Sequence, residues 1–222
     1  MARRLTDEEW AVLIEAHPEL AELPADLRRL ADHIEVAAGS PVFRLGARPA
    51  RILWVLQGEV RLVRRSRNGA EIVLQRAYSG FVAEASIQSH RYHCDAVAVV
   101  DSRLLGFPIE PFRQALRHDT EFQTFWMNRL AREVRLLRSQ CERLALRSAT
   151  DRIEHYIESE GSNGRLELSR TRKAWAAELG LTHEALYRAL ASLRRSGRIS
   201  AVEGEGGLVL TLKADHGVKG GA

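Results

Sequence analysis

The sequence predicts an α+β protein in which a β-barrel or sandwich and a terminal pair of helices are joined by one long helix. Short apolar alternations separated by glycine turns run from Ile34 to about Phe107. The apolar residues then change to a regular helical spacing, and two short helices broken at Gly180 follow near the end. A period of two indicates strands and a period near 3.6 indicates helices, so the parts of the chain differ in class.

The composition is typical of a soluble globular protein. Hydrophobic residues make up 45% and charged residues 28% of the 222 residues, which is enough for one large domain or two ordinary ones. The N-terminus lacks the apolar region of a signal peptide, and no run approaches about 18 apolar residues, so we expect a cytoplasmic protein with no membrane partner. The two cysteines, Cys94 and Cys141, are too few for a disulfide framework.

The positive charge is concentrated near the C-terminus. The net charge is +4 and the pI is about 9.4. From Arg165 to Arg198 there are eight cations and three anions. A local cationic excess of this kind favours contact with phosphates.

The N-terminal 35 residues are predicted to form short helices. Thr6 and Glu9 match a capping box, in which each side chain accepts a hydrogen bond from the backbone N–H of the other. Pro18 and Pro24 interrupt the helical pattern because proline has no N–H to donate.

Alternating residues predict the strands that follow. Apolar residues alternate on both sides of Gly58, where we expect the chain to turn. Asn68-Gly69 predicts a hairpin with a type I′ turn, because both residues tolerate a positive φ. Ala96 and Ala98 are expected to point inward from a later strand.

One long helix is predicted past Thr120. Its apolar residues recur at spacings of 4, 3, 4 and 3 between arginines, which is the pattern of a helix that packs against a second helix. We therefore expect a parallel coiled-coil homodimer, and the alternative is that this stripe packs on its own barrel. The predicted seam consists of Leu130, Val134, Leu137, Cys141 and Leu144.

The stretch from Ser169 to Arg198 predicts a helix-turn-helix. Ala174, Ala177 and Leu179 are expected to give its first helix an apolar side, and Thr182 is a candidate N-cap for the second. The apolar back of the second helix is predicted to consist of Leu186, Leu190 and Leu193. Two apolar runs, 199–202 and 208–212, predict a hairpin after it, which would form a wing.

The whole order resembles the cyclic-AMP receptor protein/fumarate–nitrate regulator (CRP/FNR) family of bacterial transcription factors. Two segments carry the resemblance: RILWVLQGEVRLVRRSRNGAEIVLQRAYSGFVAEASI is similar to the family's β-roll, and TRKAWAAELGLTHEALYRALASLRRSGRI to its DNA reader. The resemblance implies an N-terminal cyclic-nucleotide-binding-like β-roll, a long dimerisation helix and a C-terminal winged helix-turn-helix. The implied domains are residues 1–109 for effector sensing, 110–147 for dimerisation and 148–222 for DNA binding.

The resemblance also assigns DNA contacts. The family's recognition helix often presents a Glu and, four residues on, an Arg, which match Glu184 and Arg188. Such an Arg can donate two hydrogen bonds to guanine, and such a Glu can accept one from cytosine. His183 occupies a further contact position and departs from many relatives there. The alternative is that Glu184 and Arg188 only form a surface ion pair. The expected phosphate contacts are Arg172, Lys173, Thr182 and Tyr187.

The implied effector pocket departs from the family's cyclic-nucleotide sensors. Those proteins keep a Gly-Glu pair and, further along, an Arg followed by Ser or Thr. Here Ala83 replaces the glycine before Glu84, and an Asp, which would repel a phosphate, stands near the Arg position. Cyclic AMP is therefore not expected as the ligand, and an iron–sulfur cluster is not expected because no cysteine precedes Cys94. The candidate pocket residues are Glu84, Ala85, Cys94 and Asp95.

The segment from His90 to Asp95 leaves three interpretations open. His93 and Cys94 could ligate a metal or haem iron. Cys94 could instead be a redox-reactive thiol assisted by the neighbouring Arg and His. The third interpretation is a solvated loop with Cys94 as a small buried residue, which is favoured because adjacent strand residues point to opposite faces.

Together these features predict a homodimeric regulator that binds an inverted-repeat operator and is not an enzyme. RNA polymerase would be a further partner if the regulator is an activator. A cupin-type metalloenzyme would need several converging histidines, and only His90 and His93 lie close together in the barrel. A ligand-binding module whose helix-turn-helix no longer reads DNA is the other alternative, and the sequence leaves the effector and any cofactor unknown.

Overall fold

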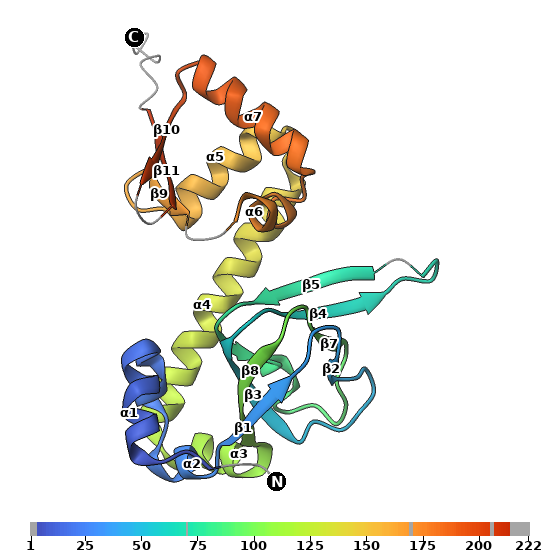
Figure 1. Cartoon of the computed structure of the whole chain (residues 1–222), viewed down its shortest axis with the longest axis vertical. Coiled ribbons are helices and arrows are strands. Elements are labelled where there is room, and N and C mark those ends of the chain that lie inside the picture. The colour runs from blue at the N-terminus through green and yellow to red at the C-terminus, as the bar shows by residue number, and fades with distance from the viewer. Residues whose placement is uncertain (1–3, 70, 169–170, 205–206, 214–222) are drawn as a thin grey trace, which may run out of the picture. The chain divides into compact units, whose positions relative to one another are not determined.

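The computed structural model divides the chain into two compact units, Met1–Arg129 and Leu130–Ala222 (Figure 1). The division falls inside the long helix rather than at either of its ends. The structure describes residues 4–69, 71–168, 171–204 and 207–213. Ser169 and Arg170, at the start of the predicted reader, and residues 205–206, at the tip of the predicted wing, lie outside these ranges.

The predicted N-terminal helices are present, but the predicted helical region of 35 residues is too long, because a strand begins at Asp32. They are α1 (Asp7–Ala16), the 3-10 helix η1 (Pro18–Glu22) and α2 (Ala25–Arg29). The capping box is present: the Thr6 hydroxyl accepts from the N–H of Glu9 at 3.3 Å, and the Thr6 N–H donates to the Glu9 carboxylate at 2.9 Å. Pro18 opens η1, and Pro24 is the N-cap of α2.

The middle of the first unit is a β-roll of two antiparallel sheets, ordered β1-β8-β3-β6 and β2-β7-β4-β5 (Figure 1). The strands are β1 (Asp32–Val36), β2 (Pro41–Phe43), β3 (Arg51–Gln57), β4 (Val60–Arg65), β5 (Glu71–Ala77), β6 (Gly80–Val82), β7 (Asp95–Ala98) and β8 (Ser102–Pro108). Apolar side chains from both sheets, including Val55, Leu62 and Ala96, form one buried cluster. Ala96 and Ala98 are fully buried, as their alternation predicts.

The hairpin at Asn68-Gly69 is confirmed, but its predicted turn type is wrong. Strands β4 and β5 pair from Arg65–Glu71 inward, so the loop is longer than two residues. Gly69 has a φ of +83°, whereas Asn68 is not among the described residues with positive φ. A type I′ turn needs positive φ at both central residues, and the longer loop removes that requirement from Asn68.

Helices cover the outer side of the β3-containing sheet with an aromatic cluster. They are α3 (Ile109–His118) and α4 (Thr120–Ala145), separated at Asp119, whose carboxylate accepts from the N–H of Phe122 at 2.9 Å. Phe81 of β6 meets Trp54 and Trp126 edge to face, with ring centroids 4.7 and 5.0 Å apart. Such packing holds the start of α4 to the roll.

The second unit contains α5 (Ala149–Glu160), β9 (Arg165–Leu168), α6 (Arg172–Glu178), α7 (His183–Arg195), β10 (Ile199–Gly204) and β11 (Gly207–Leu212). The strands form one antiparallel sheet in the order β10-β11-β9. The predicted hairpin after the helix pair is therefore present, and β9 adds a third strand that the sequence analysis missed. Only two apolar residues alternate in β9, which is too short a pattern to predict a strand by itself.

No helix in the described ranges is long and apolar enough to cross a membrane.

Candidate nucleic-acid interface

Local sequence signals fix the geometry of the helix-turn-helix. Thr171 and Thr182 are the N-caps of α6 and α7, and their hydroxyls accept from backbone N–H groups at 3.2 and 3.1 Å. Gly180 lies between the helices with a φ of +66°, a conformation that costs glycine little. The predicted apolar side of α6 is partly wrong, because Ala177 is exposed. The buried side consists of Trp175, Ala176 and Leu179.

Helix α7 has a buried back and an exposed front. Leu186, Leu190 and Leu193 are buried as predicted, together with Ala189. The predicted reading residues all lie in the exposed part of its first two turns: His183, Glu184, Tyr187 and Arg188. Within the described residues no ion pair joins Glu184 to Arg188, so the surface-pair alternative has no support and both groups are available to a ligand.

Side chains from α6, α7 and β10 contact one another at the exposed front of α7. The Arg172 guanidinium lies over the Tyr187 ring at 5.6 Å and donates to its hydroxyl at 3.2 Å. The same Arg172 forms an ion pair with Glu203 of β10. The His183 ring lies 4.7 Å from the Tyr187 ring. The contacts to Arg172 therefore tie α6 and β10 to the front of α7, and Glu203 is a member that the sequence analysis missed.

The residues predicted to contact phosphates differ in whether their side chains already have partners within the chain. Lys173 is exposed at the start of α6 and keeps its charge available. Arg172 is already shared between Glu203 and Tyr187. The Thr182 hydroxyl accepts the capping bond and can still donate its own hydrogen.

The predicted seam on α4 is largely exposed. Val134, Leu137 and Leu144 are 46%, 46% and 47% exposed, and Cys141 is also exposed. Leu130 is half-buried. Met127, three residues before Leu130 and 64% exposed, continues the same spacing and was missed by the sequence analysis.

The residue expected to meet an effector is engaged within the chain. Glu84 is 9% exposed, and its carboxylate accepts from Arg129 of α4 at 2.8 Å. Arg129 also pairs with Glu19 of η1 at 3.2 Å and lies over the Phe81 ring at 5.0 Å. Ala83, where cyclic-nucleotide sensors have glycine, adopts a φ of +70°, and Ala85 is exposed.

The remaining pocket candidates have structural roles in the roll. The Asp95 carboxylate accepts from the backbone N–H of Leu45 at 2.8 Å. Cys94 is 2% exposed in the roll's apolar cluster. Tyr92 stacks on Phe43 with ring centroids 3.8 Å apart, and both rings belong to the same apolar cluster as Cys94. These residues do not fit a cyclic phosphate: none supplies a free cation, and Asp95 opposes an anion.

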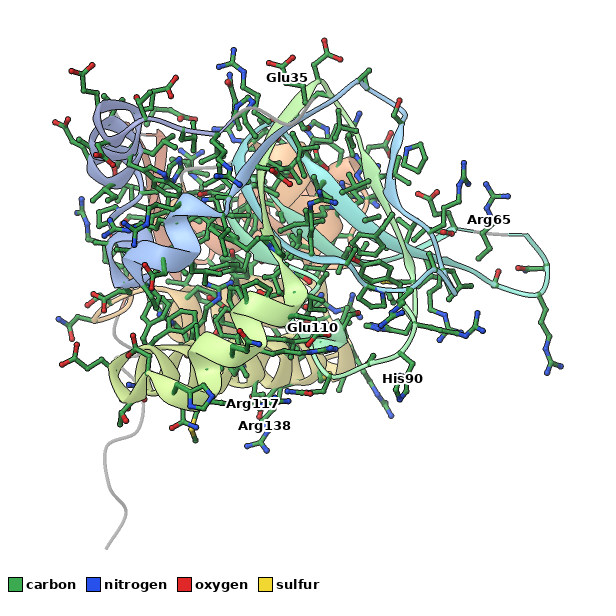
Figure 2. The ribbon with its side chains drawn as sticks, turned by 90° about the horizontal axis from the view of Figure 1, so that it is seen from below. Glu35, Arg65, His90, Glu110, Arg117 and Arg138 are labelled. Carbon is green, nitrogen blue, oxygen red and sulfur yellow. The ribbon has the colours of Figure 1, made fainter. Side chains whose placement is uncertain are left out.

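The geometry of the described residues gives no support to the two active roles considered for His93 and Cys94. Burial, and then the charge of Asp95, raise the pKa of the Cys94 thiol, whereas a redox-reactive thiol needs a lowered pKa. His93 is exposed while Cys94 is buried, so the two side chains do not converge. His90 projects from the outside of the roll (Figure 2). Among the described residues no three His, Cys, Asp or Glu side chains form a metal-binding group.

A pocket in the first unit lies at the outer side of the roll, and Cys94 and Asp95 do not line it. It has a volume of about 290 Å³. It is lined by Ala16, His17, Pro18, Glu19, Trp54, Ser79, Gly80 and Arg129. Arg129 is thus shared between this pocket and the Glu84 carboxylate.

The first unit contains a β-roll that packs against the start of a long helix, and the second contains two short helices followed by a β-hairpin. Residues 33–119 match the family model of the cyclic nucleotide-binding domain. No relative is found among the curated proteins. The first unit therefore has the fold of a cyclic nucleotide-binding domain.

Solved structures extend the likeness over nearly the whole chain. DNR from Pseudomonas aeruginosa is 22% identical, covers 95% of this chain and 97% of its own, and gives a TM-score of 0.52. FixK2 from Bradyrhizobium japonicum is 18% identical over 82% of this chain and 92% of its own, with a TM-score of 0.58. CprK (C200S) complexed with OCPA is 19% identical over 86% and 90%, with a TM-score of 0.61. The resemblance to CRP/FNR-type regulators is thereby confirmed at the level of the fold.

Proposed function

We propose that this protein is a homodimeric transcription regulator that reads an inverted-repeat DNA operator with α7. The observation that carries the proposal is the two-sided character of α7, whose back is buried while Glu184 and Arg188 stand exposed together on its front. One helix face can present both groups to a base pair in the major groove, which admits an α-helix. A transcriptional regulator, DNR, is among the proteins that share the fold.

The exposed stripe on α4 supports a second copy of the chain as partner. Val134, Leu137 and Leu144 recur at the spacing of a coiled-coil seam and leave nearly half of each side chain exposed. A two-fold dimer of this kind places its recognition helices about 34 Å apart, one turn of DNA. An inverted repeat is the matching operator, and RNA polymerase becomes a partner if the regulator activates.

The regulator acts without catalysis and, by this proposal, without cyclic AMP. The basis is that Glu84 is paired with Arg129, and that Asp95 stands where a phosphate would need a cation. The effector stays unidentified, and a regulator that needs none is compatible with the same contacts.

Selection from a random duplex library tests the reading role. The wild type is expected to select an inverted repeat. Arg188→Ala should then lose discrimination at one G·C pair in each half-site, worth about 1–3 kcal/mol. Lys173→Ala should weaken all duplexes alike and reduce the salt dependence, because it removes only a phosphate contact.

Two outcomes would contradict the proposal. Absence of any selected sequence would favour a ligand-binding module that no longer reads DNA. An Arg188→Ala protein with wild-type discrimination at every position would show that α7 does not read bases through this residue.

A further inference from the structure

Arg152 of α5 joins two segments that are distant in sequence: the end of α4 and the turn of the helix-turn-helix. Its Nε donates to the carbonyl oxygen of Leu146 at 2.9 Å, and its Nη2 to that of Leu144 at 3.4 Å. Its Nη1 donates to the carbonyl oxygens of Leu179 and Gly180 at 3.2 and 3.3 Å. All four acceptors are main-chain carbonyl oxygens, so one guanidinium links two segments of the backbone.

The acceptors explain why an arginine occupies this position. The last carbonyls of a helix have no partner within the helix and carry partial negative charge. Helix α4 ends at Ala145 and α6 ends at Glu178, so both helix ends present such carbonyls to Arg152. The planar, permanently charged guanidinium supplies five donors in a rigid fork, whereas a lysine ammonium has three donors at a single nitrogen on a flexible stem.

The surrounding packing leaves little room for movement at this junction. A Cβ added to Gly180 would lie 3.0 Å from the Leu144 side chain and 3.2 Å from Nη1 of Arg152. A second arginine, Arg143 of α4, is 2% exposed, lies over the Tyr156 ring of α5 at 4.5 Å and donates to the Ser159 hydroxyl at 3.1 Å. The end of α4, helix α5 and the reader's turn therefore pack as one piece.

We propose that Arg152 is a positioning residue that fixes the recognition helix against the end of the dimer helix and so sets the half-site spacing that the dimer accepts. Helix α7 begins at His183, three residues after Gly180, so the turn held by Arg152 determines where the front of α7 starts. The inference rests on the proposed function, because it concerns two readers joined through paired α4 helices. Arg152 itself touches no DNA in this scheme.

The test uses the full-length protein and the duplex that the wild type selects from a random library. That duplex is rebuilt as a single half-site and with the half-sites moved closer or further apart by one and two base pairs. In Arg152→Gln, the affinity ratio between the selected spacing and the shifted spacings should fall by about tenfold, the factor for one lost hydrogen bond to a charged group. Affinity for the single half-site should stay at the wild-type value, and Arg152→Lys should fall between the two proteins.

Leu166→Ala is the matched control. Leu166 of β9 is 7% exposed in the core of the same domain and belongs to neither segment that Arg152 joins. Its loss should reduce the folded fraction and weaken every duplex by the same factor, leaving the spacing preference unchanged. Circular dichroism melting reports the folded fraction of each variant.

The outcomes separate the inference from the proposed function. A folded Arg152→Gln protein that keeps the wild-type spacing preference overturns the inference. So does a uniform loss on all duplexes, as in the control. If Arg152→Gln does not fold, Arg152→Lys decides by the same criteria. A wild type that selects no inverted repeat contradicts the proposed function itself, and this inference with it.

Discussion

Replacing Arg129 by methionine should loosen the first unit, and the structure indicates by how much. The substitution keeps a long apolar side chain but removes the guanidinium that meets Glu84, Glu19 and the Phe81 ring. Glu84 is 9% exposed, and the Arg129 side chain 14% exposed. The Glu84 carboxylate therefore stays almost buried after its cationic partner has gone.

The expected cost is dominated by that buried carboxylate. Removing one partner of a buried pair costs about 3–5 kcal/mol, and the residual exposure of both groups places this pair at the lower end. The contact with Glu19, which is 38% exposed, adds well under about 1 kcal/mol. The cation–π contact with Phe81 adds about 1 kcal/mol. We expect a total of about 4 kcal/mol for Arg129→Met.

A double-mutant cycle isolates the pair. Glu84→Gln should cost about 1 kcal/mol, because its side-chain oxygen can still accept from Arg129. The double variant Glu84→Gln/Arg129→Met should be more stable than Arg129→Met alone, because it buries no charge. The measurement is hydrogen exchange by mass spectrometry on the amides of β3 and β6, where about 4 kcal/mol of destabilisation speeds exchange from unfolded states by roughly a thousandfold. Strictly additive effects of the two single changes would refute the reasoning, because the pair would then contribute no coupling energy.

Three further predictions concern other parts of the molecule. Leu137→Glu should give a monomer by sedimentation equilibrium, because it places a charge in the seam, whereas Arg138→Gln beside it should stay dimeric; a dimeric Leu137→Glu would exclude this seam. Gly180→Ala should lower the melting temperature more than Gly197→Ala. Both glycines have positive φ, but an added Cβ at Gly180 meets Leu144 and Arg152, whereas at Gly197 it meets nothing within 4 Å. Equal losses would show that the residues around Gly180 can move to accept a Cβ. In native protein a thiol reagent should modify Cys94 only after unfolding, because this thiol is buried. Burial also raises the pKa of Cys94 above its ordinary value of 9.0. The unfolded thiol therefore ionises first, and stability should fall as the pH rises above 9.0, a loss that Cys94→Val removes.

Features encoded by neighbouring residues could be predicted from the sequence. The Thr6–Glu9 capping box, the break at Gly180 and the Thr182 cap each depend on residues within three or four positions of one another. The alternation of Ala96 and Ala98 identified the inward face of β7 for the same reason. The turn type at Asn68 could not be predicted from neighbouring residues, because the pairing register of β4 and β5 determines the loop length.

The contacts that organise the candidate sites lie beyond the reach of local patterns. Glu84 and Arg129 are 45 positions apart, Arg172 and Glu203 are 31 apart, and Arg152 and Leu179 are 27 apart. The resemblance to cyclic-nucleotide sensors placed Glu84 in a pocket, whereas in the structure its carboxylate pairs with Arg129 of a distant helix. A charge read from sequence therefore identifies a candidate ligand group, but only the fold shows whether the chain already satisfies it.

The pairing of Glu84 with α4 has a consequence for how this roll could respond to a signal. A ligand shifts a two-state equilibrium only by the difference in its affinity for the two states. Any ligand that used the Glu84 carboxylate would first have to separate it from Arg129, and the cost of that separation would be subtracted from its binding free energy. The same separation would release α4 from one of its contacts with the roll, just before the seam begins at Leu130. The Arg129–Glu84 pair would thus oppose such a ligand and hold α4 to the roll with the same contact, so that strengthening one effect necessarily strengthens the other.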